Sequence, residues 1–325
     1  MLHAAVVAVA VAAAAWSGVA AAQTQTDALG WLQKMYTATT KLNYTGTFIY
    51  QYGNQSETSR ITRLVDGPNV HERVETLDGM PREIVRVNDE VKCYLPNSMT
   101  LKIDRKQVSK PFPGMLPEQA QTLGAYYNIR KGEVDRIAGY DTQSIILEPR
   151  DGMRYAHKLW ADTATGMLVK AKTFNERGEL LEQFFFTDLK IGGRIEKDAV
   201  KSRFASKGGT WRVENLAMNE VKLADAGWHL KSLPPGYAKV TEMRGSVGGH
   251  DGVAHIVLSD GMAAASVFIE PLAARTPPSH LGLSRQGAMN VYTRKVDDSL
   301  VIVVGDMPGE GVRFIANQIE YRKPN

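Results

Sequence analysis

Cysteine is nearly absent from this 325-residue chain, which contains only Cys93. A single cysteine cannot form an intrachain disulfide, so the core must hold the fold without covalent cross-links. Cys93 lies in a predicted strand, 91–95, and no histidine stands near it in the sequence. We interpret it as a buried structural thiol rather than a nucleophile, because no local motif supports the second role.

Recognised catalytic motifs are also missing. The chain has no Walker phosphate-binding loop, no G-x-S-x-G elbow, no H-E-x-x-H motif and no C-x-x-C pair. The glycine-rich run 245–252 lacks dinucleotide-binding spacing and is predicted to be a loop. His250 and His255 are the closest pair of histidines, but five residues apart on a strand they would point to opposite faces. We therefore predict no enzymatic activity, no cofactor and no metal.

Charge is missing from the first part of the chain. Residues 2–22 contain no Asp, Glu, Lys or Arg and end in three alanines before polar Gln23. This pattern is typical of a secretory signal peptide, although the usual basic residues at its start are absent. A buried alanine-rich helix and a retained membrane anchor are the alternatives, since about 20 apolar residues can span a bilayer. We predict a signal peptide over 1–22 and a periplasmic protein, in a compartment that permits disulfides without requiring them.

The net charge of the chain is small, +4, with a sequence pI of about 8.9 and mixed signs throughout. Such mild basicity favours an acidic partner or an anionic membrane surface over nucleic acid, which an exported protein rarely meets. About 300 residues follow the leader, a length that predicts two domains.

Residues 151–191 are the most informative part of the sequence. They predict three strands, 154–161, 167–174 and 179–191, joined by turns that begin with Asp or Asn and end with Gly. A meander so rich in aromatic side chains curves over an apolar interior, and we predict that Trp160 and Phe184 line a lipid cavity there. Nothing in the meander resembles a catalytic arrangement, so the function must be argued from binding.

Shorter strands separated by Asp-Gly and Gly-Asn turns precede the meander, at 44–51, 57–65, 70–77, 82–87 and 91–95. A helix that follows the N-cap residue Thr26 presents an apolar face to them. Strand spacing of 8–12 residues predicts an antiparallel sheet. The fold class is therefore α+β and mainly antiparallel β, with a large, unclosed N-terminal β-barrel and its packed helix over 23–203.

A proline-rich segment, 110–123, interrupts this pattern. Proline cannot pair in a central strand, so the segment is either a surface connection or an apolar flap over the mouth of the curved sheet. In the second case Phe112, Met115 and Leu116 would contact lipid.

A second unit follows a polar stretch. We predict a linker over 204–222 and a smaller β-rich domain over 223–325. A hairpin is expected over 253–270, and the run 300–304 is apolar throughout and therefore predicted to be a central strand. A helix over 310–321 ends the domain. The connection 192–223 is a candidate hinge.

Four arginines lie near Asp-Gly-Met runs and form the clearest candidate binding patch: Arg82, Arg86, Arg150 and Arg154. Guanidinium groups suit carboxylates and phosphates, so the patch could anchor an acidic peptide or a lipid phosphate. The ordinary alternative is cross-strand ion pairing with Glu72, Glu75 or Glu83.

Several segments together resemble the MucB/RseB family of periplasmic regulators of the envelope-stress sigma factor. The matching stretches are 42–50 (LNYTGTFIY), 77–86 (LDGMPREIVR), 93–96 (CYLP), 136–139 (RIAG), 149–155 (PRDGMRY), 159–162 (LWAD), 165–168 (TGML), 258–269 (LSDGMAAASVFI) and 303–308 (VVGDMP). Their order and spacing are specific to the family, although residues 263–265 are three alanines, a less distinctive sequence than is expected in this hairpin.

This resemblance implies a larger domain similar to the lipoprotein carriers LolA and LolB. It implies a smaller domain that helps to bind the periplasmic part of a transmembrane anti-sigma factor. Binding would shield that factor from site-1 proteolysis, and lipid or lipopolysaccharide would release it. Homo-oligomers are left open.

Three other classes of function are alternatives to the one that this resemblance implies. A periplasmic lipid or lipoprotein carrier would use the same half-barrel, but a minimal carrier has no need of a second domain. An exported hydrolase has no recognisable nucleophile or metal site. A purely structural envelope protein would not explain a cavity.

Overall fold

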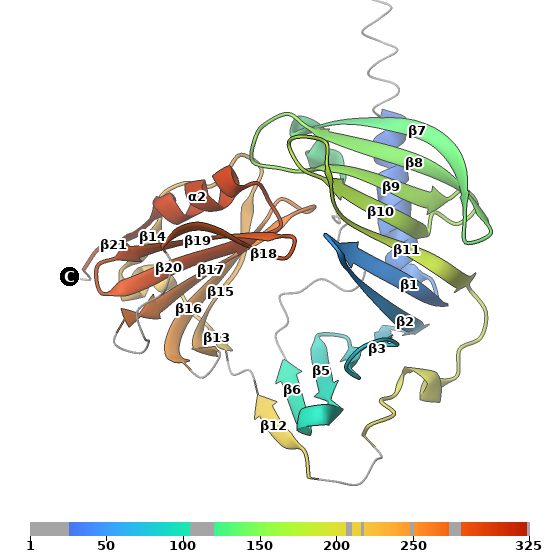
Figure 1. Cartoon of the computed structure of the whole chain (residues 1–325), viewed down its shortest axis with the longest axis horizontal. Coiled ribbons are helices and arrows are strands. Elements are labelled where there is room, and N and C mark those ends of the chain that lie inside the picture. Colours follow the sequence, from blue (N-terminus) through green and yellow to red (C-terminus); the bar gives the residue numbers. More distant parts are fainter. Residues whose placement is uncertain are drawn as a thin grey trace, which may run out of the picture.

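The computed structural model describes residues 26–104, 120–205, 210–215, 218–247, 250–272 and 281–323. Figure 1 shows two β-rich domains side by side, a large one in blue to yellow and a smaller one in orange to red. None of the described helices is long and apolar enough to cross a membrane. The predicted signal peptide and the predicted flap residues Phe112, Met115 and Leu116 lie outside the described residues.

The large domain is built on one sheet of twelve strands, in the order β12-β6-β5-β4-β3-β2-β1-β11-β10-β9-β8-β7. Its strands are β1 (Tyr44–Tyr52), β2 (Gln55–Asp66), β3 (Asn69–Thr76), β4 (Glu83–Val87), β5 (Glu90–Leu95), β6 (Thr100–Asp104), β7 (Tyr127–Ile137), β8 (Tyr140–Pro149), β9 (Ala156–Asp162), β10 (Leu168–Phe174), β11 (Leu180–Ile191) and β12 (Arg212–Asn215). Pairing is antiparallel except for β12, which runs parallel to β6. Since β12 and β7 are edges that do not pair with each other, the sheet is unclosed, as predicted.

Tight turns and alternating burial explain these strands. Gly53 and Gly67 have φ of 54° and 59°, values that glycine tolerates and that close the β1–β2 and β2–β3 hairpins. Alternate residues of β1 are buried, including Tyr44 and Phe48. Gly46 lies between them because a Cβ there would come within 2.8 Å of the Phe186 ring.

A helix over residues 26–41 covers one face of this sheet, which we call the inner face. Ala28, Leu32 and Met35 of the helix belong to the same buried core as side chains of β1, β2 and β7–β11. The core is therefore formed between the helix and the sheet, as the amphipathic pattern predicts. Short 3₁₀ helices connect the strands: η1 (Pro96–Ser98), η2 (Ala120–Ala125) and η3 (Lys197–Val200).

The small domain has a seven-stranded sheet in the order β13-β15-β16-β17-β20-β19-β18. Its elements are β13 (Met218–Glu220), η4 (Leu223–Ala226), β14 (Trp228–Leu230), β15 (Ala238–Val247), β16 (His250–Ser259), β17 (Ala264–Pro271), β18 (Gly282–Gln286), β19 (Met289–Val296), β20 (Ser299–Gly305), α2 (Gly309–Gln318) and β21 (Ile319–Tyr321). Strand β20 is central, as its apolar run predicts. Helix α2 packs on the sheet through Val312, Ile315 and Ala316.

Several details differ from the sequence prediction. The last helix ends at Gln318, because Ile319–Tyr321 forms a strand that pairs with β14. The predicted linker 204–222 contributes a strand to each sheet, β12 to the large one and β13 to the small one. The segment before it is not free either, since the Arg203 backbone N–H donates to the Glu83 carboxylate at 3.1 Å. Strands β7 and β8 were not predicted.

Candidate functional site

Phe184 lies on the inner face of the large sheet. It stands opposite Ala171 of β10, which stands opposite Leu159 of β9, and opposed residues share a face. All three belong to the core under the helix. Phe184 is 5% exposed and meets Phe186 edge-to-face, with ring centroids 6.4 Å apart. Phe184 thus points inward, but into a packed core, and its role in lipid binding stays a prediction.

Trp160 lies on the opposite, outer face, which corrects the expectation that it shares a cavity with Phe184. Trp160 stands opposite Lys170, and Lys170 stands opposite Phe185. The ammonium groups of Lys158 and Lys170 lie 4.8 Å and 5.2 Å from the indole centroid. Lysine stems and cation–π contacts cover the ring, so it is buried without facing the interior.

Arg82 lines a cavity of about 800 Å³. The cavity lies where the β1–β2 turn, the β3–β4 loop and the end of β5 meet. Its lining residues are Tyr52, Gln55, Ser56, Glu57, Thr76, Asp78, Gly79, Met80, Pro81, Arg82, Leu95, Asn97 and Ser98. The volume is within the range of about 300–1,000 Å³ that small-molecule sites occupy.

Polar contacts fix the rim of this cavity. Arg82 Nη2 donates to Glu57 Oε1 at 2.6 Å, an exposed pair. Both Asp78 carboxylate oxygens accept the Thr58 backbone N–H at 3.0 Å, which lowers the pKa of Asp78. Met80 is nevertheless 78% exposed beside them. The loop is thus anchored while it presents an apolar side chain to solvent.

Arg86 belongs to a charged row on the inner face. Tyr44, Arg63, Glu72 and Arg86 stand opposite one another on β1 to β4. Arg63 Nη1 donates to Glu72 Oε2 at 2.8 Å, with side chains only 3% and 6% exposed. Burial lowers the pKa of Arg86, and the nearby Glu72 carboxylate opposes that shift. Of the acidic residues expected near these arginines, Glu72 is therefore the neighbour of Arg86.

Arg150 and Arg154 have different environments. Arg150 is exposed, and its backbone N–H donates to the Tyr126 carbonyl at 2.9 Å. Arg154 is 1% exposed and lies between the two domains, where its Nε donates to Asp260 Oδ2 at 2.7 Å. In this arrangement Arg154 offers no accessible donor to a partner, whereas Arg150 is exposed, and the role of the four arginines in partner binding stays a prediction.

Other residues also join the domains. Met262 of the small domain belongs to the buried core of the large one. Asn290 Nδ2 donates to the Tyr155 hydroxyl at 2.8 Å. A second cavity, of about 560 Å³, is lined by both domains, with Tyr52 and Leu181 on one side and Arg285 and Gly287 on the other. Since Tyr52 lines this cavity and the 800 Å³ one, the β1–β2 hairpin separates the two.

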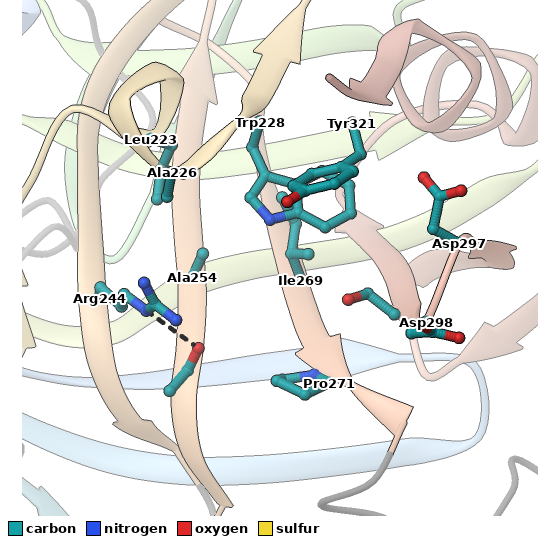
Figure 2. Close-up of a pocket in the computed structure, with 12 residues that line it drawn as sticks. Leu223, Ala226, Trp228, Arg244, Ala254, Ile269, Pro271, Asp297, Asp298 and Tyr321 are labelled. Carbon is teal, nitrogen blue, oxygen red and sulfur yellow. Dashed lines mark hydrogen bonds between the residues drawn. The ribbon is translucent and has the colours of Figure 1, made fainter. Parts of the chain in front are cut away.

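A third cavity, of about 340 Å³, lies within the small domain. Figure 2 shows Arg244 on one side, Asp297 and Asp298 on the other, and the rings of Trp228 and Tyr321 between them. The two ring centroids are 5.1 Å apart. Arg244 Nε donates to the Gly252 carbonyl at 3.4 Å.

Two family models match this chain. The MucB/RseB N-terminal domain matches residues 27–204, and the MucB/RseB C-terminal domain matches residues 222–320. The chain belongs to the MucB/RseB family. Together the matched residues take in the twelve-stranded sheet except β12, the seven-stranded sheet except β13, and the β14–β21 pair except Tyr321.

Individual relatives agree with this assignment. The chain is 31% identical over 288 residues to the sigma factor AlgU regulatory protein MucB of Pseudomonas aeruginosa, with 87% of each chain covered. It is 26% identical over 295 residues to the sigma-E factor regulatory protein RseB of Escherichia coli, with 89% of each covered. Among solved structures, a complex of P. aeruginosa MucA and MucB is similar, with a TM-score of 0.70, 28% identity and coverage of 91% of this chain and 99% of that one.

The MucB/RseB relatives are named as regulators rather than as enzymes. Within the described residues no three His, Cys, Asp or Glu side chains are grouped so that they could hold a metal ion. Burial raises the pKa of the Cys93 thiol, which disfavours the reactive thiolate.

Sequence reasoning missed the partners of Arg154, which lie in the other domain. One signal was present: the tripeptide Asp-Gly-Met occurs three times, at 78–80, 151–153 and 260–262. The first lines the 800 Å³ cavity, and the other two meet at the domain contact. Their proximity could not be derived from spacing in the sequence.

Proposed function

We propose that this chain is a periplasmic negative regulator of the envelope-stress response. It binds the periplasmic domain of a transmembrane anti-sigma factor and shields that domain from site-1 proteolysis. A lipid or lipopolysaccharide signal releases the bound factor. The observation that carries the proposal is the family match along both domains, together with the solved complex of a 28%-identical MucB with MucA.

The geometry suits a partner that contacts both domains. A peptide that crosses the β1–β2 hairpin at Tyr52 would pass from the 800 Å³ cavity to the 560 Å³ cavity between the domains. Arg82 at the first cavity and the exposed Arg150 supply donors for acidic side chains. The chain's net charge of +4 also favours association with an acidic partner.

The 800 Å³ cavity is the better candidate for lipid, because the core around Phe184 is already filled by the helix. Met80, Pro81 and Leu95 supply apolar surface for an acyl chain, and Arg82 lies where a phosphate would bind. If lipid and partner favour different arrangements, each weakens the other by the same factor, typically about 5–150-fold.

Isothermal titration calorimetry with the purified periplasmic domain of the cognate anti-sigma factor tests the proposal. We expect saturable binding by the full chain, reduced by Arg82→Ala, and weakened when vesicles containing lipopolysaccharide are added. Trp160→Ala, on the outer face, is the matched control for lipid. Absence of binding by a folded protein would contradict the proposal, and binding unaffected by lipid would contradict its release step.

A periplasmic lipid or lipoprotein carrier is the second candidate, favoured by the same cavity beside Met80. Transfer of a fluorescent lipid between two vesicle populations distinguishes the two functions. A carrier would accelerate transfer in proportion to its concentration, whereas a regulator would bind lipid without accelerating transfer.

A further inference from the structure

Arg154 is enclosed by aromatic rings from both domains. Its Cζ lies 4.7 Å from the ring centroid of Tyr126 in the large domain and 5.1 Å from that of Tyr237 in the small domain. A third ring, Tyr127, lies 6.0 Å away. The Arg154 guanidinium also donates to the Pro235 backbone carbonyl. A planar guanidinium held between rings has little freedom to rotate, so its donors keep fixed directions.

Two Asp-Gly-Met turns, one from each domain, accept the remaining donors. Asp260 Oδ2 accepts Arg154 Nε, while Asp260 Oδ1 accepts the backbone N–H groups of Met262 and Ala263 at 2.9 Å and 2.8 Å. Asp151 acts in the same way: one oxygen accepts the Met153 N–H at 2.9 Å and the other accepts Arg154. Each carboxylate is therefore oriented by its own turn before it meets the arginine.

Such a buried ion pair fixes the relative orientation of the two domains more than it strengthens their association. A buried ion pair loses the hydration of both charges, so it is often no more stabilising than apolar packing. Misalignment is strongly penalised, because a displaced domain would leave a buried charge without its partner. We therefore expect two states of the domain contact, one closed geometry and an open state in which water reaches the buried charges. Intermediate arrangements of the domains should be sparsely populated.

We propose that Arg154 is a positioning residue that fixes the relative orientation of the two domains through Asp260, and thereby the surface that a partner of both domains meets. The second part rests on the proposed function. The first part concerns the free protein alone, so the two parts can be tested separately.

Asp260→Asn is the most specific variant. The amide oxygen can still accept the N–H groups of Met262 and Ala263, but the amide nitrogen then faces the Arg154 Nε–H, donor against donor. The turn is kept while the interdomain bond is lost. Arg154→Met tests the same contact from the large domain. The matched control is Glu72→Gln, which removes a carboxylate from a buried arginine pair within the large domain.

Double electron–electron resonance measures the orientation directly. Spin labels would be attached at Thr187→Cys in β11 and Lys295→Cys in β19, both exposed, in a Cys93→Ser background. We expect one narrow distance distribution for the otherwise unchanged chain and for Glu72→Gln, and a broad one for Asp260→Asn and Arg154→Met. Circular dichroism confirms that each variant is folded. A narrow, unshifted distribution in both folded interdomain variants would overturn the proposal.

Partner binding tests the second part. Calorimetry with the anti-sigma periplasmic domain should show affinity about tenfold lower for Asp260→Asn than for Glu72→Gln. Equal affinities, together with a broadened distance distribution, would overturn the link to partner binding and leave the positioning role supported. If no variant binds and the unchanged chain does not bind either, the proposed function fails, while the distance measurement still decides the first part.

Discussion

Two of the buried arginine–carboxylate pairs in the described residues, Arg63–Glu72 and Arg154–Asp260, have different structural roles. Arg63 and Glu72 are nine residues apart and lie on adjacent strands inside the large domain. Arg154 and Asp260 are 106 residues apart and join two domains. The chemistry and the distances, 2.8 Å and 2.7 Å, are nearly the same. The two pairs differ in how they can become exposed to water. The first pair is exposed only when the large domain unfolds, whereas the second is exposed when the two domains separate.

The largest effect is expected inside the large domain. Glu72→Ala leaves Arg63 buried without a carboxylate, which should lower the free energy of unfolding of this domain by about 3–5 kcal/mol. Urea titration followed by circular dichroism measures it. A loss below about 1 kcal/mol would mean that water already reaches the pair and would remove the contrast with the interdomain one.

Acid should destabilise the large domain through His157. Burial lowers the pKa of this imidazole to about 4, while in the unfolded chain it titrates near 6.5. The unfolded state therefore takes up the proton first, and roughly 3 kcal/mol of stability is lost as the pH falls from about 6.5 to 4. His157→Gln should flatten this dependence in thermal melts at stepped pH.

His255 extends the pH comparison to the small domain. Burial lowers its pKa to about 4 as well, and its ring stacks on Phe268 with centroids 4.4 Å apart. His255→Gln should therefore flatten the acid response of the small domain and leave that of the large domain unchanged. Identical effects of both variants on one transition would show that the two domains unfold as a single unit.

A smaller loss is expected at the interdomain pair. Asp260→Asn should lower stability by about 1–3 kcal/mol, because parting of the domains lets water solvate Arg154. The loss should appear in differential scanning calorimetry as separation of two transitions. A loss as large as that of Glu72→Ala, in one transition, would show that the domain contact cannot open independently.

The smallest effect is expected at the exposed pair. Arg82 and Glu57 have side chains 42% and 39% exposed. Arg82→Ala should change the free energy of unfolding by no more than about 1 kcal/mol, since exposed ion pairs contribute little. Chemical denaturation checks this. A larger loss would mean that Arg82 supports the loop structurally, and its proposed binding role would lose its main argument.

Much of the fold follows from local sequence. Strands β1 to β5 were predicted within two residues of their ends, because alternation and glycine turns are local signals. Strand β7 was missed because its edge position leaves it largely exposed and charged, with Arg130, Glu133 and Asp135 along it. An exposed edge strand lacks the apolar alternation on which the prediction depends.

The site was less predictable than the fold. Leu159 and Trp160 are adjacent and both apolar, so the sequence did not show which one faces the interior. The lysines beside Trp160 indicate that it lies on the outer face, but their proximity is known only once the strands are paired. The role of Arg154 depends on a carboxylate in another domain. Such long-range pairings carry no signal in residue spacing.

The cleavage rate of the cognate anti-sigma periplasmic domain by its site-1 protease tests the central claim most directly. With a saturating amount of this protein, we predict that cleavage slows by at least tenfold and recovers when lipopolysaccharide is added. Cleavage at the same rate with and without the folded protein would contradict the claim.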